Sequence, residues 1–394
     1  MNLGPAELLA RFSRREPTFL LDVRAAKEFA AWRIEGPAEV TALNAPYTRM
    51  LAEVEGDDLP RAIARYVEAN LADAIPRGRL VVAVCAKGGT SAFVAEGLRS
   101  LGYDAVSLTG GTKAWGDWYD VRAVVDEPDL AVLQIARPAR GCLSWIAVSG
   151  DAAVVIDPLR HLERYHEVVA ARGARIVAVI DTHAHADHVS GGRALADAVG
   201  APYRLHPYDA IHPIDLVPAR IPYEPLTEGV RVPFGASVLE ALHVPGHTIG
   251  ALALRLDGRF LFAGDTLFVA SIARPDLGGR AEAWTPLHHA SLRRLLDLPR
   301  ETIVFPGHFS SPAEADDGGA YVTSIADLRA GNDGARRALG DLDPFARYIL
   351  ASLPEFPPQY VEIKRLNLGL ADAVDDRAAE LELGKNVCAL AAPA

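Results

Sequence analysis

Residues 181–192 read DTHAHADHVSGG and place three histidines and two aspartates within twelve residues. The side chains of His183, His185, Asp187 and His188 follow one another closely enough to serve one metal centre. Imidazole and carboxylate groups are the ligands expected for zinc or non-haem iron. By itself, the stretch is compatible with two zinc ions that hydrolyse a substrate and with one iron ion that activates dioxygen.

Three later segments repeat the same design, in which an apolar strand ends and a histidine or aspartate follows. They are VLEALHVPGHT with His247, RFLFAGDTLF with Asp265 and ETIVFPGH with His308. The 181–192 stretch follows the apolar run ARIVAVI in the same way. Ligands at strand ends are held by a rigid scaffold that can aim them at one point. A lone histidine is more often structural, but four segments of this kind predict a metal centre.

The composition excludes several classes of protein. Half of the 394 residues are hydrophobic, which indicates a globular chain of two or three domains rather than a disordered one. A net charge of −11, with no run of lysine or arginine, argues against a nucleic-acid surface and against a membrane anchor. The N-terminus has no apolar core of signal-peptide length, and no apolar run approaches the ~20 residues of a membrane span. Three cysteines cannot form a disulfide framework, so we expect a cytoplasmic protein.

The pattern of apolar runs predicts two domains of different architecture. In residues 1–125, the strands TFLLDV, RLVVAVC and YDAVSLTGG alternate with helical segments, which is typical of a parallel sheet in a small α/β domain. The polar stretch DVRAVVDEPD is expected to separate the domains. Residues 126–394 then begin with short strands joined by turns and end in a helical tail over about 320–394. We therefore expect an α/β domain followed by an α+β domain.

The stretch VVAVCAKGGTS places Cys85 at the end of a strand, before a glycine-rich loop and a helix. Backbone N–H groups in such a loop and the positive end of the helix both stabilise a thiolate, which lowers the pKa of a cysteine. Lys87 can add a positive charge, Thr90 and Ser91 can donate hydrogen bonds, and Lys87 and Thr90 are candidate substrate-binding residues. The alternative is a buried structural cysteine, but the start of a Gly-Gly loop is an unusual place for one. We therefore predict that Cys85 is a reactive nucleophile.

The first domain resembles a single rhodanese domain. LLDVRAAKEFAAWRIEG is similar to the opening Asp-x-Arg segment of that family, and SLTGGTKAW is similar to its closing Gly-Gly-x-x-x-Trp segment. The active loop of the family is roughly Cys-x-x-Gly-x-Arg/Ser, and Cys85 and Gly88 match it. Thr90 stands where an arginine is frequent, which disfavours a thiosulfate-type anion as the sulfur donor. The resemblance implies that Cys85 carries a persulfide sulfur and passes it to a thiol or to sulfite.

The second domain resembles the metallo-β-lactamase fold, an αββα sandwich, over about residues 130–320. His-x-His-x-Asp-His is the signature of that fold, and the later histidine, aspartate and histidine follow in the same order. The complete set of ligands for two metals is present. One ion would use His183, His185, His247 and Asp265, and the other would use Asp187, His188, Asp265 and His308. On these ligands, a dinuclear zinc hydrolase similar to glyoxalase II is one interpretation.

Three further features resemble the persulfide dioxygenases within this fold. The loop GDTLFVASIARPDLGG carries Arg274, Pro275 and Asp276, which match the Arg-x-Asp loop of that group better than the loop of glyoxalase II. RGCLSWIAVSGDAAVVIDP and LPEFPPQYVEIKRLNLG are similar to the beginning and the end of the same group. A fused rhodanese domain also makes chemical sense when both domains handle sulfane sulfur, whereas a thioester hydrolase has no obvious use for Cys85.

The resemblance implies a single Fe(II) ion per chain, held by His183, His247 and Asp265. Two histidines and one carboxylate leave about three positions open for dioxygen and the persulfide sulfur. The remaining metal-site residues would support these ligands or, in the alternative, bind a second metal, and they are His185, Asp187, His188 and His308. The residues alone do not decide between one iron ion and two zinc ions.

Arg274 is the candidate for binding a substrate carboxylate, with Asp276 beside it, because a guanidinium group can hold a carboxylate through two hydrogen bonds. The alternative is an internal ion pair between these two residues. Cys142 begins an apolar strand and is expected in the core, and Cys388 has no expected role. Six further histidines are expected to be structural or exposed, and they are His161, His166, His206, His212, His288 and His289.

We therefore predict a bifunctional sulfur enzyme. Its second domain is expected to oxidise a low-molecular-weight persulfide, with glutathione persulfide favoured, to sulfite with Fe(II) and dioxygen. Its first domain is expected to move sulfane sulfur through Cys85 and to join it to sulfite as thiosulfate. A homodimer is compatible with the helical tail, and neither a nucleic acid nor a membrane is an expected partner. The alternative is a dinuclear zinc thioester hydrolase in which a degenerate rhodanese module serves as a binding domain.

Overall fold

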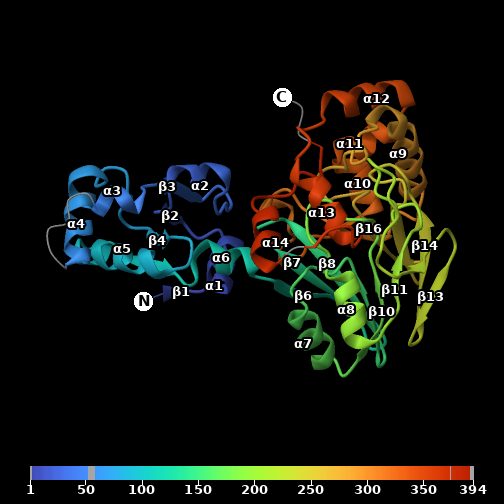
Figure 1. The fold of residues 1–394 in the computed structure, drawn as a ribbon, viewed down its shortest axis with the longest axis horizontal. Coiled ribbons are helices and arrows are strands. Elements are labelled where there is room, and N and C mark those ends of the chain that lie inside the picture. Colours follow the sequence, from blue (N-terminus) through green and yellow to red (C-terminus); the bar gives the residue numbers. More distant parts are fainter. Residues whose placement is uncertain (1, 52–57, 373, 391–394) are drawn as a thin grey trace.

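A smaller N-terminal domain and a larger C-terminal domain lie beside each other along the long axis of the molecule (Figure 1). The computed structural model describes residues 2–51, 58–372 and 374–390. Each domain has its own hydrophobic core. At the junction, Ala139 of the larger domain packs into the core of the smaller one, so the two domains are in direct contact.

The smaller domain is built on a five-stranded parallel sheet in the order β1-β5-β4-β2-β3. Its run TFLLD is buried at every residue, as expected for a strand that helices cover on both faces. The strands are β1 (Asn2–Leu3), β2 (Thr18–Asp22), β3 (Val40–Asn44), β4 (Leu80–Val84) and β5 (Ala105–Leu108). The helices are α1 (Pro5–Ser13), α2 (Ala26–Ala31), α3 (Tyr47–Leu51), α4 (Leu59–Asn70), α5 (Gly89–Ser100) and α6 (Gly111–Asp117).

β4 lies at the centre of this sheet, and its carboxyl end carries the cysteine loop. The strand ends at Val84, Cys85 follows directly, and α5 begins at Gly89. The predicted order of strand, loop and helix around Cys85 is therefore confirmed. Carboxyl ends of parallel strands form the edge at which α/β proteins bind ligands, so the loop is well placed for chemistry.

The larger domain begins with a seven-stranded sheet in the order β12-β11-β10-β9-β8-β7-β6. Strands β6 to β9 pair as antiparallel neighbours, whereas β9 to β12 run parallel. The strands are β6 (Asp120–Asp126), β7 (Ala131–Arg137), β8 (Cys142–Ser149), β9 (Ala152–Ile156), β10 (Arg175–Ile180), β11 (Tyr203–Leu205) and β12 (Glu224–Pro225). The run RIVAVI thus forms β10, and the first histidine segment follows its carboxyl end.

A second sheet of six strands, in the order β13-β14-β15-β16-β17-β18, faces the first. Its strands are β13 (Arg231–Phe234), β14 (Ser237–His243), β15 (Leu252–Leu256), β16 (Phe260–Gly264), β17 (Ile303–Pro306) and β18 (Thr323–Ser324). The remaining metal-site segments follow β14, β16 and β17, as the strand-end pattern predicts. All four segments therefore lie at the ends of strands in two packed sheets.

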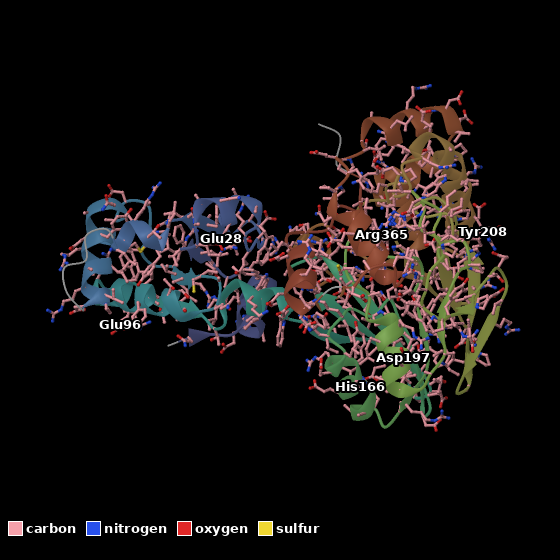
Figure 2. The ribbon with its side chains drawn as sticks, viewed as in Figure 1. Glu28, Glu96, His166, Asp197, Tyr208 and Arg365 are labelled. Carbon is pink, nitrogen blue, oxygen red and sulfur yellow. The ribbon has the colours of Figure 1, made fainter. Side chains whose placement is uncertain are left out.

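Helices cover the outer faces of the two sheets and complete four layers (Figure 1). The first sheet is covered by α7 (Glu163–Ala171) and α8 (Gly192–Val199), marked in Figure 2 by His166 and Asp197. The second sheet is covered by α9 (Ala281–Leu296), α10 (Ile325–Gly331), α11 (Asp333–Ala338) and α12 (Leu342–Ala351). Apolar side chains of both sheets fill the space between them, including Trp145, Phe262 and Phe305. The predicted αββα sandwich after a parallel-sheet α/β domain is confirmed.

Most of the stretch DVRAVVDEPD, which was expected between the domains, forms β6 and pairs with β7 along its length. β6 is the edge strand of the seven-stranded sheet. A short 3-10 turn (Pro312–Glu314) precedes β18, and the region after β18 is helical, as expected, and includes α13 (Gln359–Asn367) and α14 (Asp375–Leu381).

None of the helices in residues 2–51, 58–372 and 374–390 combines the length and the apolar character that a membrane crossing requires.

Candidate metal centre and reactive cysteine

Three buried side chains converge at strand ends of the larger domain. His183 follows β10, His247 follows β14, and Asp265 follows β16. Nε2 of His183 and Nε2 of His247 lie 3.7 and 3.3 Å from Oδ2 of Asp265. These three atoms are buried without a hydrogen-bond partner, and buried polar atoms of this kind call for a shared ligand. Two imidazole nitrogens and one carboxylate oxygen at these separations fit a divalent transition metal.

Two of these ligands are oriented through their other polar atom. Nδ1–H of His247 donates to the backbone carbonyl of Arg274 at 2.8 Å, and Nδ1–H of His308 donates to Oδ1 of Asp265 at 2.6 Å. A side chain at Gly307 would overlap the Asp265 carboxylate, so glycine is required for this close packing. Contacts of this kind fix the ring and carboxylate orientation that metal binding needs.

Asp157 supports the two histidines of the His-x-His pair. Its Oδ2 accepts a hydrogen bond from the Thr182 hydroxyl at 2.9 Å, and that hydroxyl lies 3.0 Å from Nδ1 of His183. Its Oδ1 lies 3.2 Å from Nε2 of His185, whose Nδ1 is buried without a partner. The sequence reasoning missed Asp157, although it directly follows β9 and obeys the strand-end pattern that identified the other residues.

The remaining metal-site residues form a second group. Oδ2 of Asp187 lies 2.9 Å from Nε2 of His308, and Oδ1 lies 3.1 Å from Nδ1 of His188. Cys142 is buried, as expected, but it also faces this group, because its Sγ lies 3.4 Å from Oδ2 of Asp187. Cys388, for which no role is expected, places Sγ within 4.8 Å of ligand atoms of Asp265 and His308.

The protonation of the centre suits metal binding. Burial alone would raise the pKa of Asp265, but the charge of His308 and hydrogen bonds from His247 and His308 outweigh it and hold the pKa well below its ordinary value. Burial, together with the neighbouring His185, lowers the pKa of His183 well below its ordinary value. The carboxylate is therefore ionised and the imidazole neutral, which are the states that bind a metal.

Asp209 ties two metal-binding segments together, and the sequence reasoning did not find it. Its Oδ2 accepts hydrogen bonds from the N–H of Ala184 and from the Thr248 hydroxyl, both at 2.7 Å. Its Oδ1 accepts from the N–H of Gly250 at 2.8 Å. Because Ala184 lies between two motif histidines and Thr248 follows His247, the aspartate sets the spacing of the two segments.

Asn367, at the end of α13, braces the same loop from the C-terminal region. Its Nδ2 donates to the carbonyls of His185 and His188, each at 2.9 Å, and its Oδ1 accepts from the N–H of Ser190 at 2.9 Å. The sequence did not predict this role of Asn367, because its hydrogen bonds join residues that lie about half the chain apart.

Arg274 does not have the position that a substrate-binding residue needs. Its side chain is fully buried and forms a two-point ion pair with Asp276, at 2.6 and 2.7 Å. Its other N–H groups donate to the carbonyls of Pro354, Glu355 and Val387. All five N–H groups are thus engaged within the protein. The structure has the internal pair that the sequence left as an alternative.

The loop after β4 gathers hydrogen-bond donors around Cys85. Its Sγ accepts hydrogen bonds from the N–H of Gly88 at 3.1 Å and from the N–H and hydroxyl of Ser91 at 3.4 and 3.2 Å. Burial alone would raise the pKa of the thiol, but bonds from Ser91 and from the backbone of Lys87 and Gly88 outweigh it and lower the pKa. Of the two hydroxyls expected to assist, Ser91 contacts the sulfur. In the part of the chain described, neither the Thr90 hydroxyl nor the Lys87 ammonium donates to it.

The Gly-Gly pair of SLTGGTKAW packs against the same loop. Gly111 has φ +61°, and a side chain there would overlap the carbonyl of Cys85. The close approach lets the N–H of Thr112 donate to the Cys85 carbonyl at 2.8 Å and the N–H of Lys113 donate to Ala86 at 3.1 Å. The first turn of α6 therefore holds the backbone of Cys85 and Ala86 in place through these two hydrogen bonds.

A buried ion-pair network joins the two domains next to that helix. Glu382, which follows α14, binds Arg137 at 2.6 Å and Arg160 at 2.8 Å. Arg160 also binds Asp117 of the smaller domain at 3.0 Å. Figure 1 shows α14 at the junction, beside α6 and β7. A cavity of about 720 Å³ opens here, and its lining includes Lys87 of the cysteine loop.

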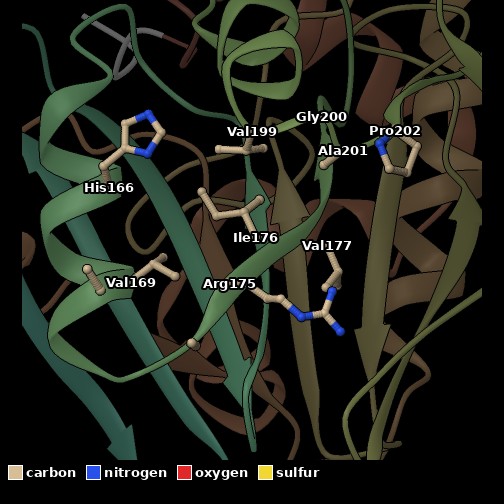
Figure 3. A pocket seen from close by; sticks show the side chains of 11 residues that line it. His166, Val169, Arg175, Ile176, Val177, Val199, Gly200, Ala201 and Pro202 are labelled. Carbon is tan, nitrogen blue, oxygen red and sulfur yellow. The ribbon is translucent and has the colours of Figure 1, made fainter.

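Among the described residues, the six histidines outside the strand-end pattern belong to none of the clusters of candidate metal ligands. His166 lines a cavity of about 460 Å³ with Val169 and Ile176 (Figure 3), and none of the metal-centre residues lines it. His288 is buried in α9, where burial lowers its pKa to about 3.

Comparison with known families matches both halves of the chain. The metallo-beta-lactamase superfamily matches residues 137–308, and the rhodanese-like domain matches residues 4–117. A hydroxyacylglutathione hydrolase of Cereibacter sphaeroides is 35% identical over 172 residues, which are 43% of this chain and 62% of the hydrolase. The chain thus spans less than two thirds of that relative. An uncharacterized protein of Aquifex aeolicus is 33% identical over 193 residues, 46% of this chain and 89% of that protein.

One solved structure with a TM-score above 0.5 supports the same fold. A metallo-beta-lactamase from Staphylococcus aureus superposes with a TM-score of 0.53 at 24% identity, over 61% of this chain and 72% of that one. ETHE1 from Myxococcus xanthus has a TM-score of 0.47 at 26% identity, over 62% of this chain and 95% of that one. The strand-end ligands, the stacked sheets and the family matches agree. The chain therefore carries a metallo-beta-lactamase superfamily domain over residues 137–308 and a rhodanese-like domain over residues 4–117.

Proposed function

We propose that the larger domain holds one Fe(II) ion and oxidises a low-molecular-weight persulfide, such as glutathione persulfide, to sulfite. The observation that carries the proposal is the set of three orphaned donor atoms on His183, His247 and Asp265. His183, His247 and Asp265 would hold an Fe(II) ion through two imidazoles and one carboxylate, and the ion would supply redox chemistry toward dioxygen. Both nitrogens of His308, by contrast, are turned toward the carboxylates of Asp265 and Asp187.

The proposed reaction balances without a further co-reactant. The persulfide RSSH, dioxygen and water give the thiol RSH, sulfite and two protons. The outer sulfur loses four electrons and its bond to the inner sulfur, and dioxygen takes up the four electrons. The inner sulfur leaves with a proton as the thiol.

A cavity of about 410 Å³ adjoins the metal centre and supports a substrate of this class. Asp209 and Thr248 line it, and both also brace metal-binding segments. Its wall includes Arg280 and Lys364, whose positive charges can bind the carboxylates of a glutathione-type thiol. These two cations take over the role that the sequence reasoning gave to Arg274. Tyr208, at the outer edge of the domain, reaches solvent at the rim of the cavity (Figure 2).

For the smaller domain we propose sulfur transfer through Cys85. The thiolate attacks the outer sulfur of a persulfide, the donor thiol leaves, and Cys85 holds the sulfane sulfur until a thiol or sulfite removes it. The lowered pKa of Cys85 and the donors from Gly88 and Ser91 support the thiolate that this step needs. Sulfite formed in the larger domain is an acceptor that yields thiosulfate.

A second candidate function is dinuclear zinc hydrolysis of a glutathione thioester. The name of the Cereibacter relative favours it, and the residues of a second metal position are present. In that case the same residues would hold two zinc ions, which would supply hydrolytic chemistry, and the smaller domain would serve as a binding module.

Metal content and oxygen uptake separate the two candidates. We expect one iron ion per chain at the three-residue site and oxygen uptake when glutathione persulfide is added. Asp265→Ala removes a ligand and should abolish both, whereas Asp297→Ala, an exposed aspartate at the end of α9, is the matched control and should change neither. Two zinc ions without iron, together with hydrolysis of a glutathione thioester, contradict the proposal.

The reaction of the larger domain and the sulfur transfer of the smaller domain can be tested independently. Cys85→Ser should leave oxygen uptake intact and remove sulfur transfer to sulfite. Sulfur transfer that survives in Cys85→Ser contradicts the role of the smaller domain alone.

A further inference from the structure

A cavity of about 720 Å³ lies at the junction of the domains, and both domains contribute to its wall. On the side of the smaller domain, the lining residues follow the carboxyl ends of β2, β4 and β5, the edge at which parallel sheets bind ligands. Ala86 and Lys87 directly follow Cys85, and Thr112 donates its N–H to the Cys85 carbonyl at 2.8 Å. A ligand in the cavity therefore lies against the loop that carries the reactive cysteine.

The opposite wall comes from the larger domain, through α14 and the residues that follow it. Leu383 lines the cavity with a side chain that is 57% exposed, which leaves apolar surface for a ligand to cover. Two contacts hold this segment against the smaller domain. A Cβ at Gly384 would lie 3.8 Å from the Trp32 ring, and Nζ of Lys385 lies 2.8 Å from the Glu35 carboxylate. The cysteine loop thus faces a surface that belongs to the other domain.

Most charged groups of the cavity wall have partners inside the protein. Those with close partners are Arg24, Glu28, Asp117, Arg137, Arg140, Glu380 and Glu382. Lys27, Lys87 and Asp376 also line the cavity and are exposed, and none of them forms an ion pair within residues 2–51, 58–372 and 374–390. Lys113 lies 3.8 Å from Asp117, so its ammonium is also available to a ligand. The smaller domain therefore offers ammonium groups, and α14 offers a carboxylate.

This distribution of charge suits a zwitterionic peptide thiol of the glutathione class. Such a thiol carries two carboxylates, which complement Lys27 and Lys87, and one ammonium group, which complements Asp376. The volume lies within the range of about 300–1,000 Å³ that is typical of small-molecule sites, and Trp32 and Leu383 add apolar surface. A small inorganic anion such as thiosulfate would leave Asp376 unpaired and most of the cavity unfilled.

We propose that this cavity binds a persulfide of the glutathione class and presents its outer sulfur to Cys85, and that α14 and Leu383 of the larger domain are part of the binding site. The inference rests on the proposed sulfur transfer and names its substrate. The Cys85 thiolate attacks the outer sulfur, the sulfur–sulfur bond of the donor breaks, and the donor thiolate leaves and takes up a proton from solvent. The exchange consumes no oxidant or reductant. The site is complete only when both domains are present.

Protection of Cys85 from alkylation tests binding without turnover. S-methylglutathione carries the charges of the substrate but no reactive sulfur, so it should slow the reaction of Cys85 with iodoacetamide in the full chain. Mass analysis of the peptide that contains Cys85 measures this reaction separately from that of the other cysteines. Thiosulfate at the same concentration should protect less. Equal protection by the two compounds, or no protection by S-methylglutathione, overturns the proposal.

Ala379→Trp tests the wall that the larger domain contributes. Ala379 lies half-buried in α14 and lines the cavity, so an indole at this position occupies space that the substrate needs. The concentration of S-methylglutathione that half-protects Cys85, and the KM for glutathione persulfide in sulfur transfer to sulfite, should both rise about tenfold, with kcat unchanged. Leu383→Ala is a milder second variant that should raise both values in the same direction.

Ala351→Trp, at the exposed end of α12, is the matched control and should change neither value. Circular dichroism and the midpoint of thermal unfolding show whether each variant is folded. If Ala379→Trp and Leu383→Ala both bind and react like the wild-type chain, α14 is not part of the site and the proposal is overturned.

Lys27→Glu tests the charge complementarity. It replaces an ammonium group in the cavity wall with a carboxylate and should raise the KM for glutathione persulfide about tenfold. The KM for the persulfide of 2-mercaptoethanol, which has no carboxylate, should stay the same. Arg65→Glu, an exposed charge reversal in α4, is the matched control and should leave both values in place. An equal rise for the two persulfides contradicts the assignment of a charged peptide thiol.

These outcomes are separate from those of the proposed function. Protection of Cys85 by S-methylglutathione without any sulfur transfer would contradict the proposed role of Cys85 and keep the binding site. Sulfur transfer that is lost in Cys85→Ser but unchanged in Ala379→Trp and Lys27→Glu would contradict the binding site alone. Oxygen uptake at the metal centre enters neither measurement.

Discussion

The carboxylate of Glu382 accepts a hydrogen bond at 2.8 Å from the backbone N–H of Val189, the residue that follows His188 in the metal centre. The same carboxylate binds Arg137 and Arg160 at the junction of the domains. One buried side chain therefore fixes both the end of the metal-binding loop and the contact between the domains. Removal of this carboxylate should therefore destabilise both the metal-binding loop and the domain junction.

Glu382→Gln should weaken folding in a pH-dependent manner. Burial alone would raise the pKa of Glu382, but the charges of Arg137 and Arg160 lower it from 4.5 to about 2. A carboxyl group of this kind stabilises the folded state above its unfolded-state pKa, and the contribution disappears as the pH falls from 4.5 toward 2. We expect a loss of about 3 kcal/mol at pH 7, shrinking at acidic pH, in denaturant unfolding.

Glu380→Gln is the control for this prediction. Glu380 lies in α14 itself but is 64% exposed and pairs with Arg377 at the surface. Its replacement should cost less than about 1 kcal/mol. Equal losses in the free energy of unfolding for the two variants would show that Glu382 contributes no more than an exposed carboxylate.

Ser91→Ala should slow the reaction of Cys85 with iodoacetamide at neutral pH. The Ser91 hydroxyl is a donor to Sγ, and its loss raises the pKa of the thiol toward the ordinary value. The rate should fall about tenfold, which corresponds to one hydrogen bond to a charged group, and the pH profile should move to higher pH. Thr90→Ala changes a neighbouring hydroxyl that does not contact the sulfur and should leave the profile in place. A similar shift in both variants contradicts the assignment.

Arg274→Lys should destabilise the larger domain rather than weaken substrate binding specifically. A lysine cannot reproduce the two-point pair with Asp276 or the three carbonyl contacts, and Asp276 becomes a partly unpaired buried charge. We expect the free energy of unfolding to fall by about 3 kcal/mol. Combining Arg274→Lys with Asp276→Asn should cost less than the sum of the single changes. Unchanged stability with a large rise in KM would restore the substrate-binding interpretation.

Asn367→Ala should lower the affinity of the metal centre. The amide holds the carbonyls of His185 and His188 and the N–H of Ser190, so its loss frees the loop that carries the motif. Loss of a supporting contact of this kind typically costs 10–100-fold in metal affinity, which chelator competition measures. Asn70→Ala, in an exposed position of the smaller domain, should have no effect. Unchanged affinity in Asn367→Ala contradicts the bracing role.

The strand-end ligands could be predicted because each one follows an apolar run directly in sequence. His183, His247, Asp265 and His308 carry this signal, and the two stacked sheets follow from the same runs. The bracing residues could not be found in this way. Asp209 and Asn367 reach the metal segments from other parts of the fold, and no local pattern marks a side chain whose partner is a distant backbone group.

Burial and function were hard to separate for two residues. Cys142 has apolar neighbours in its strand and is buried as predicted, yet its sulfur faces the metal centre because β8 begins beside His308. Arg274 lies in a motif that resembles a substrate loop, but only the fold reveals that Asp276 and three carbonyls engage it. The edge strand β6 is half exposed and therefore polar, so its sequence resembles that of a connecting segment.

Residues 382–384, which follow α14, contact two parts of the protein that are synthesised much earlier. During synthesis, the N–H of Val189 emerges 193 residues before its partner Glu382. Arg140 donates to the carbonyl of Asp187 and also to the carbonyls of Leu383 and Gly384, which are synthesised much later. The metal-binding loop and the domain junction therefore gain these contacts together, once the segment after α14 has been synthesised, and a nascent chain that stops short of α14 lacks them.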